Sequence, residues 1–356
     1  MEIGTQGLEN KRGKRQIKRW YSWIGYAALF WSVIYGIMNF YWLLGGEGYP
    51  FIQEERTGVF SALFTYLPVQ AGSAVFCVLC ILGIFFSIAM LKEWGRKVSP
   101  RFIVFFSWGF AVFLLLLIPD YRLIAAMAYA FLFKFPFGWQ ILNQVVCLIG
   151  GLLWVFAIIS YQRKVRNACR DCGRKENGKP IVLIRWTKWL IYVAAIAPLP
   201  YAIIRFSWAL GIPLGVERQM LEDLAKVNPM ATLTEWVFGG LCIGGGLLTL
   251  GLIQKWGEVF PNWFPFIGGK RVPVLMAVIP ASVVAIALTS AGFIFTFGFF
   301  AVTLQLVPAQ GIVLSEIVGT VGPMLFWIPW GVALGLSTIS YYYRRRGQCE
   351  YCGRND

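Results

Sequence analysis

The sequence predicts an all-α polytopic membrane protein of about eight transmembrane helices, arranged as two tandem parallel four-helix repeats. Three observations carry this prediction. The composition is 58% hydrophobic and 17% aromatic with only 14% charged residues, too apolar for the interior of a soluble chain of 356 residues. The apolar sequence falls in segments long enough to cross a bilayer. The first half of the chain recurs, in outline, in the second.

Apolar segments and the basic clusters between them define the spans. The expected helices are 21–44, 69–91, 102–118, 140–162, 187–210, 236–254, 272–293 and 320–342. The first follows a basic stretch and is too long for a secretory signal, so we expect a retained membrane helix. Pro198 and Pro200 interrupt the fifth segment and predict a kink there. Before the sixth segment, apolar residues on one helical face predict a short amphipathic helix at the outer surface.

Basic residues are concentrated in alternate connections between the spans. Five clusters, at 11–19, 92–101, 163–188, 255–271 and 344–354, hold 26 of the 32 lysines and arginines. This asymmetry is typical of the positive-inside rule and explains the net charge of +15 without a nucleic-acid partner. We therefore expect a multi-pass protein of the cell (plasma) membrane with both termini in the cytoplasm. Anionic lipids on the cytoplasmic side are expected partners, and a protein partner or an oligomer stays open.

Two apolar, aromatic segments, 121–137 and 294–310, do not fit this pattern as spans. If both crossed the membrane, each half would have five spans, and the basic clusters 163–188 and 344–354 would lie on opposite sides. We interpret the two segments as re-entrant or interfacial, which is tolerated at membrane depth where protein or water surrounds the backbone. A loosely packed outer hairpin is the alternative.

The repeat relates residues 19–172 to residues 185–352. A set of first-span residues returns at one constant offset of 166 positions: Arg19, Trp20, Trp23, Tyr26, Tyr35, Trp42, Leu44 and Gly45 recur as Arg185, Trp186, Trp189, Tyr192, Tyr201, Trp208, Leu210 and Gly211. An even number of spans in each half makes the halves parallel. The expected organisation is a basic cytoplasmic tail (1–18), a first membrane repeat (19–175), a cytoplasmic linker (176–184) and a second membrane repeat (185–356).

Each half ends in the same motif, Cys-x-x-Cys-Gly-Arg. Its cysteines are Cys169 and Cys172 in the first half and Cys349 and Cys352 in the second. The motif resembles a zinc knuckle, and a closed structural site needs four ligands. Because parallel halves place both motifs on one side, the sequence predicts one structural zinc ion held by all four cysteines. Neighbouring basic residues are expected to lower the pKa of these thiols. A redox dithiol in each half, two separate metal knuckles, and ligands shared across a dimer are the alternatives.

Polar residues within the apolar segments form a second candidate site. Arg205 lies within a span, where a central charge costs about 2.5–3.5 kcal/mol on insertion scales, and its counterpart in the first half is Asn39. At a similar outer depth lie the acids Asp120, Glu235 and Glu316 and the amides Asn143 and Gln144. These seven residues are expected to form a polar, outward-facing chamber between the halves. The alternative is that Arg205 extends its guanidinium group to the outer interface.

The sequence shows no catalytic constellation, since it contains no histidine, no phosphate-binding loop and no dinucleotide fingerprint. We therefore do not expect an enzyme. The chain resembles multi-pass membrane proteins of Gram-positive bacteria with the same tandem halves and Cys-x-x-Cys-Gly-Arg ends, a resemblance that implies no established activity, ligand or binding residue. Two functions remain. The duplication and Arg205 favour a transporter or channel for a small solute or ion. The scarcity of charges in the spans favours a non-transporting sensor, assembly factor or accessory subunit with a cytoplasmic partner.

Overall fold

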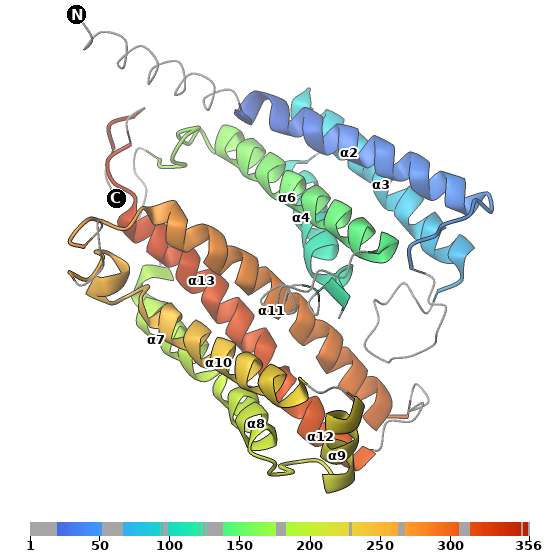
Figure 1. Ribbon diagram of the computed structural model, residues 1–356. Coiled ribbons are helices and arrows are strands. Elements are labelled where there is room, and N and C mark those ends of the chain that lie inside the picture. The colour runs from blue at the N-terminus through green and yellow to red at the C-terminus, as the bar shows by residue number, and fades with distance from the viewer. Residues whose placement is uncertain are drawn as a thin grey trace, which may run out of the picture.

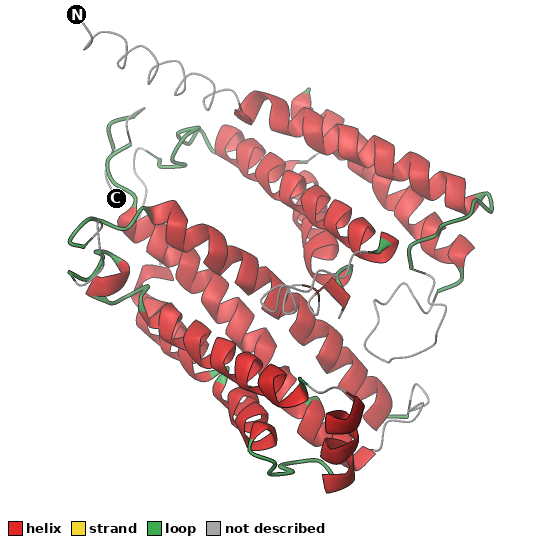
Figure 2. Cartoon of the chain, in the orientation of Figure 1, coloured by secondary structure: helices red, strands yellow, loops and turns green. Residues whose placement is uncertain are grey.

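The computed structural model describes residues 20–51, 67–92, 94, 99–120, 122–123, 126, 138–175, 183–227, 230–262, 268–305, 314–349 and 352–354. Within these ranges the architecture is helical, and loops join the helices at two opposite ends of the molecule (Figure 2). Across the described residues, 8 helical segments are long and apolar enough to cross a membrane. The predicted class, an all-α polytopic membrane protein, is confirmed.

Four of these segments form a first helical unit. They are α2 (Trp20–Leu43), α3 (Val69–Leu91), α4 (Pro100–Val112) with the π-helix η3 (Phe113–Leu117) that continues it, and α6 (Trp139–Val165). The shared core of this unit is aromatic. Trp31 stacks on Tyr35 with ring centroids 4.9 Å apart, and Phe110 packs edge-on against Trp154 at 5.3 Å. Ring packing of this kind stabilises helices in lipid, where the contrast between water and apolar side chains contributes little.

The remaining segments form a second helical unit. They are α7 (Leu183–Ile196), α8 (Leu199–Ala209), α10 (Ala231–Leu250), α11 (Val274–Thr303), α12 (Leu314–Thr320), η5 (Gly322–Phe326) and α13 (Trp327–Arg345). The break between α7 and α8 falls at Pro198, as predicted, and α9 (Arg218–Val227) is the predicted amphipathic helix. At Gly331, α13 comes so close to α11 that an added Cβ would lie 2.6 Å from the backbone nitrogen of Thr289. A side chain at this position would therefore separate the two helices.

The seventh span corrects one prediction. Helix α11 continues without interruption to Thr303, so residues 294–303 extend a spanning helix instead of forming a separate re-entrant or interfacial segment. No proline or charged residue occurs between 293 and 303 to end the helix. Its 30 residues rise by about 45 Å, more than the roughly 30 Å apolar core of a bilayer. Residues 306–310, and all of 121–137 except 122–123 and 126, lie outside the described residues.

Among the described residues, the two units meet at two main places. The first is helical: η3 packs against α11, where the hydroxyl of Ser290 donates to the carbonyl of Leu116 at 3.0 Å. The second is the end of the molecule at which α2 and α7 begin and α6 and α13 end (Figure 1). Three pairs of spans are in contact in both units: first with second, third with fourth, and first with fourth; in the first unit the second span also contacts the third. The loops that follow α6 and α13 meet at this second junction, and both carry a Cys-x-x-Cys motif.

Candidate metal centre

Each Cys-x-x-Cys motif folds into a tight loop just after a spanning helix. In the first loop, the backbone N–H of Cys169 donates to the carbonyl of Arg174 at 2.9 Å, and that of Gly173 donates to the carbonyl of Cys169 at 2.8 Å. The same two bonds recur in the second loop at 3.0 and 2.8 Å. The φ angles of Gly173 and Gly353 are 74° and 70°, a left-handed conformation that glycine adopts without a steric penalty. The two motifs are therefore equivalent knuckles.

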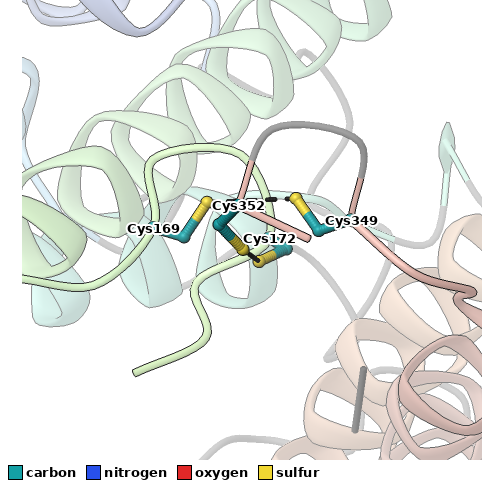
Figure 3. A group of neighbouring side chains, drawn as sticks. All are labelled: Cys169, Cys172, Cys349 and Cys352. Carbon is teal, nitrogen blue, oxygen red and sulfur yellow. Dashed lines mark hydrogen bonds between the residues drawn. The ribbon is translucent and has the colours of Figure 1, made fainter. Parts of the chain in front are cut away.

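The four cysteine sulfurs converge between the two knuckles (Figure 3). The Sγ atoms of Cys169 and Cys349 lie 4.0 Å apart, and those of Cys172 and Cys352 lie 3.6 Å apart. All four lie within 4.8 Å of one another. A tetrahedral zinc ion with Zn–S bonds of about 2.3 Å separates its sulfur ligands by about 3.8 Å. The type, number and spacing of the donors therefore fit one four-coordinate metal ion.

The thiol of Cys172 is held toward its protonated form. Burial, followed by the neighbouring cysteines, raises its pKa to about 12, although the backbone N–H of Arg174 donates to the sulfur at 3.5 Å and opposes the shift. The expectation that nearby basic residues lower the thiol pKa is therefore wrong for Cys172, because burial raises this pKa by more than the backbone N–H of Arg174 lowers it. A coordinated metal ion reverses the balance, since it deprotonates the thiols that bind it.

Arginine side chains connect the two knuckles directly. Arg174 is 7% exposed, and its guanidinium group donates to the carbonyls of Arg354 at 2.5 Å and Gly347 at 3.0 Å in the other knuckle. In return, Arg346 donates to the carbonyl of Cys172 at 2.6 Å. From the sequence these arginines were expected only as nearby positive charge, and their bonds to carbonyl groups were missed. The signal for Arg174 was present, because the motif ends in Arg in both halves.

The first knuckle is also fixed to its own helical unit. Arg163, in the last turn of α6, donates through Nη1 to the carbonyls of Arg170 and Asp171, both at 2.9 Å. The hydroxyl of Tyr21, at the start of α2, donates to the carboxylate of Asp171. The position of the cluster is thus coupled to the ends of two spanning helices.

The seven polar residues expected in one chamber are distributed over separate places. In the first unit, the hydroxyl of Tyr35 donates to Oδ1 of Asn143 at 3.1 Å, while Asn39 donates to the backbone carbonyl of Tyr35 at 2.9 Å. Nearby in the same unit, the backbone N–H of Asp120 donates to Oε1 of Gln144 at 3.0 Å. Burial raises the pKa of the Asp120 carboxyl group, while hydrogen bonds, first that from Gln144, oppose the shift.

Arg205 lies in the second unit and pairs with Glu235. Its Nη1 atom is 2.9 and 2.8 Å from the two carboxylate oxygens, and the two side chains are 15% and 7% exposed. The rings of Tyr201, Trp208 and Phe238 lie 4.7, 5.2 and 5.7 Å from the guanidinium carbon. The charge is thus compensated by one acid and enclosed by aromatic faces, which attract cations.

A pocket of about 430 Å³ lies beside this pair, between the ends of α8, α9 and α10. Glu235 lines it together with Glu222 and Arg218. Glu316 lies elsewhere, half-buried in α12, where its backbone carbonyl accepts a hydrogen bond from the hydroxyl of Thr320 at 2.8 Å. Of the three candidate acids, the structure places Glu235 against Arg205.

Comparison of the chain with known protein families, with curated proteins and with solved structures finds no match. Fold and site nevertheless define a class: an integral membrane protein with eight apolar helices in its described residues and a four-cysteine cluster suited to a metal ion. Its function has to be inferred from the geometry of the cluster and of the charged pair.

Proposed function

We propose that this chain is a non-transporting membrane protein, an assembly factor or accessory subunit, whose two helical units are clamped by one structural zinc ion at the cytoplasmic face. One observation carries the proposal. Four cysteine sulfurs from two loops about 180 residues apart in sequence lie within 4.8 Å of one another. Such a cluster joins the ends of α6 and α13, and hence the two units.

The donor set supports zinc in a structural role. Four cysteines complete a tetrahedral shell, so no coordination position stays open for substrate or water, unlike in catalytic zinc sites. Sulfur-only tetrahedral sites select zinc or iron–sulfur chemistry, and Cys-x-x-Cys knuckles with a following glycine are typical of zinc. The matched knuckles and the matched helix contacts also support two tandem parallel repeats, 19–175 and 185–356.

The environment of Arg205 supports the non-transporting assignment. A substrate site needs a charge that is free to meet its ligand, whereas Arg205 is already bonded to Glu235 and enclosed by three rings. The pair therefore serves stability. The pocket lined by Glu235 favours the second candidate, a transporter or channel for a small solute or ion. A potential-driven ion leak in vesicles that disappears in Glu235→Gln would support that candidate against ours.

Elemental analysis of the purified full-length protein tests the zinc clamp. We expect about one zinc per chain, lost in Cys172→Ser and in Cys349→Ser alike, because either change opens a closed four-ligand shell. Cys77→Ser is the matched control, since Cys77 is a half-buried thiol within α3 and away from the cluster. Zinc bound to a monomer, shown by light scattering, excludes ligands shared across a dimer. A metal-free wild type with unchanged stability refutes the clamp.

Impermeant thiol labelling of intact cells tests the orientation. The segment before α9 and the segment after α10 lie at opposite ends of the molecule (Figure 1), and each contains an exposed residue, Glu217 and Lys255. We expect Glu217→Cys to be labelled from outside above the wild-type background and Lys255→Cys only after permeabilisation. The reverse pattern would place the cysteine cluster outside the cell and reject a cytoplasmic clamp.

A further inference from the structure

A groove of about 650 Å³ runs along the exposed face of α4 and ends at the carboxyl end of α6. Its apolar walls include Phe105, Trp108 and Val112, which are 80%, 36% and 45% exposed. These positions recur at intervals of three to four residues and therefore lie on one helical face. The groove belongs to the part of α4 that crosses the membrane, so the hydrocarbon of a lipid is its natural neighbour.

Gly109 makes this face hollow. An added Cβ at Gly109 would meet no heavy atom within 4 Å, so the space beside the backbone is open. The exposed rings of Phe105 and Trp108 stand near this gap on the same face. A chain of methylene groups fits between them, and a volume of this size lies within the range of ordinary ligand pockets.

Positive charge is confined to one end of the groove. Arg101, in the first turn of α4, and Arg166, just after α6, both line it and are both exposed. Neither has an ion-pair partner within the described part of the chain. This end is also the end at which the cysteine knuckles lie, since α4 begins there and α6 ends there. Guanidinium groups bind phosphate oxygens in a planar, charge-assisted geometry.

We propose that this groove is a specific site for one anionic phospholipid. The two arginines bind its phosphate headgroup, and one acyl chain lies along Val112, Trp108 and Phe105 beside Gly109. Charge at one end and apolar walls beyond it match a phospholipid in one leaflet, with its headgroup at the membrane surface and its acyl chain parallel to α4. The lipid site shares no residue with the zinc clamp, so either proposal can fail without the other.

Native mass spectrometry of the detergent-purified protein tests the site with three probes: phosphatidylglycerol, phosphatidylcholine and soluble glycerol phosphate. We expect one phosphatidylglycerol per chain, weaker phosphatidylcholine and no retained glycerol phosphate. The double variant Arg101→Gln/Arg166→Gln should lower the affinity for phosphatidylglycerol about 30-fold, because it removes two charges near the membrane surface. The same double variant should leave the affinity for phosphatidylcholine unchanged. Gly109→Leu should displace both lipids, because its side chain fills the hollow.

Matched controls keep the test specific. Arg185→Gln/Lys188→Gln removes two exposed charges at the start of α7, and Gly240→Leu adds a side chain into open space on α10. Both should retain phosphatidylglycerol at wild-type affinity. Equal retention of the two phospholipids, undiminished binding in Gly109→Leu, or equal losses in the controls would overturn the proposal. Tight binding of glycerol phosphate would show a phosphate site without an acyl chain, which also overturns it.

Discussion

The two helical units differ at equivalent positions within the spans: one unit has a neutral side chain where the other has a charged one. At the offset of 166 residues, Tyr35 and Asn39 of α2 correspond to Tyr201 and Arg205 of α8. In the first unit the position holds a neutral amide bonded to its own helix. In the second it holds a charge, which needs Glu235 from α10 and a surround of aromatic rings. A charge at this position thus occurs together with a partner on a neighbouring helix.

At the end of the molecule that carries the two knuckles, the two units are alike. Both knuckles make the same backbone hydrogen bonds and place glycine at the same left-handed position. The difference between the two ends has a physical reason. A hydrogen-bonded pair inside one unit can be exchanged for another without consequence for the other unit. A tetrahedral site built half from each unit holds both to one geometry, because every ligand must reach the same ion.

Removing the zinc ion that we propose should have the largest effect on the molecule. Structural zinc contributes an apparent binding free energy of about 10–16 kcal/mol near neutral pH in zinc-finger peptides. We expect chelation, or Cys352→Ser, to speed amide exchange at the ends of α6 and α13 by at least about a hundredfold, while the middle of α3 is unaffected. Exchange that accelerates equally throughout both units would show that the ion supports the whole fold and not the junction.

Breaking the Arg205–Glu235 pair should have the second-largest effect on stability. Arg205→Leu leaves the carboxylate of Glu235 buried without compensation, which costs about 3–5 kcal/mol. The double variant Arg205→Leu/Glu235→Leu should recover most of that loss, because no charge stays buried. Thermal unfolding in detergent measures both. In the first unit, Asn39→Leu is the matched control with a smaller expected cost, about 1 kcal/mol for one hydrogen bond. If Arg205→Leu left the midpoint unchanged, the pair would have no structural role.

The two motif arginines, Arg174 and Arg354, allow a sharper comparison between the two knuckles. Arg174 is buried and makes bonds of 2.5 and 3.0 Å across the junction, whereas the bond from Arg354 to the carbonyl of Arg174 is longer, at 3.5 Å. Loss of an outer contact to a metal site typically costs about 10–100-fold in metal affinity. We expect the loss of zinc affinity in Arg174→Gln to lie within this range and the loss in Arg354→Gln to be smaller. Competition for zinc with a chromophoric chelator measures both losses. Arg170 is exposed, so Arg170→Gln should bind zinc with the affinity of the wild type. Equal losses in the two motif variants would mean that charge alone, and not bonding, supports the site.

Several of these features were predictable from the sequence. Span number follows from apolar length, and the joined cysteine pairs follow from the repeat together with an even number of spans in each half. The partner of Arg205 was not predictable among three acids, since it depends on how each helix is rotated about its axis. The extension of α11 was missed because its apolar sequence, without a breaker after residue 293, reads equally as helix or as re-entrant segment. The bonds of Arg174 depend on how the two loops approach, which no local pattern encodes.

An effect smaller than that of breaking the charged pair is expected in the neutral core of the first unit. The hydroxyl of Tyr35 donates to Asn143 at 3.1 Å and accepts from the thiol of Cys147 at 3.2 Å, and the Tyr35 side chain is fully enclosed. Tyr35→Phe removes both contacts and leaves a buried amide oxygen unsatisfied, so we expect a loss of about 1–3 kcal/mol in unfolding free energy. Tyr26→Phe, on the exposed face of the same helix, should be silent.

A double-mutant cycle decides whether that loss belongs to the hydrogen bond. Asn143→Leu alone also leaves the Tyr35 hydroxyl without its acceptor, while Tyr35→Phe/Asn143→Leu removes both polar groups together. The coupling energy of two bonded residues is typically about 0.5–3 kcal/mol, so the double variant should cost less than the two single losses combined. Strict additivity would show that the two residues act independently. Tyr35 and Asn143 would then stabilise the first unit through packing, and their contrast with the Arg205–Glu235 pair would be one of packing and not of hydrogen bonding.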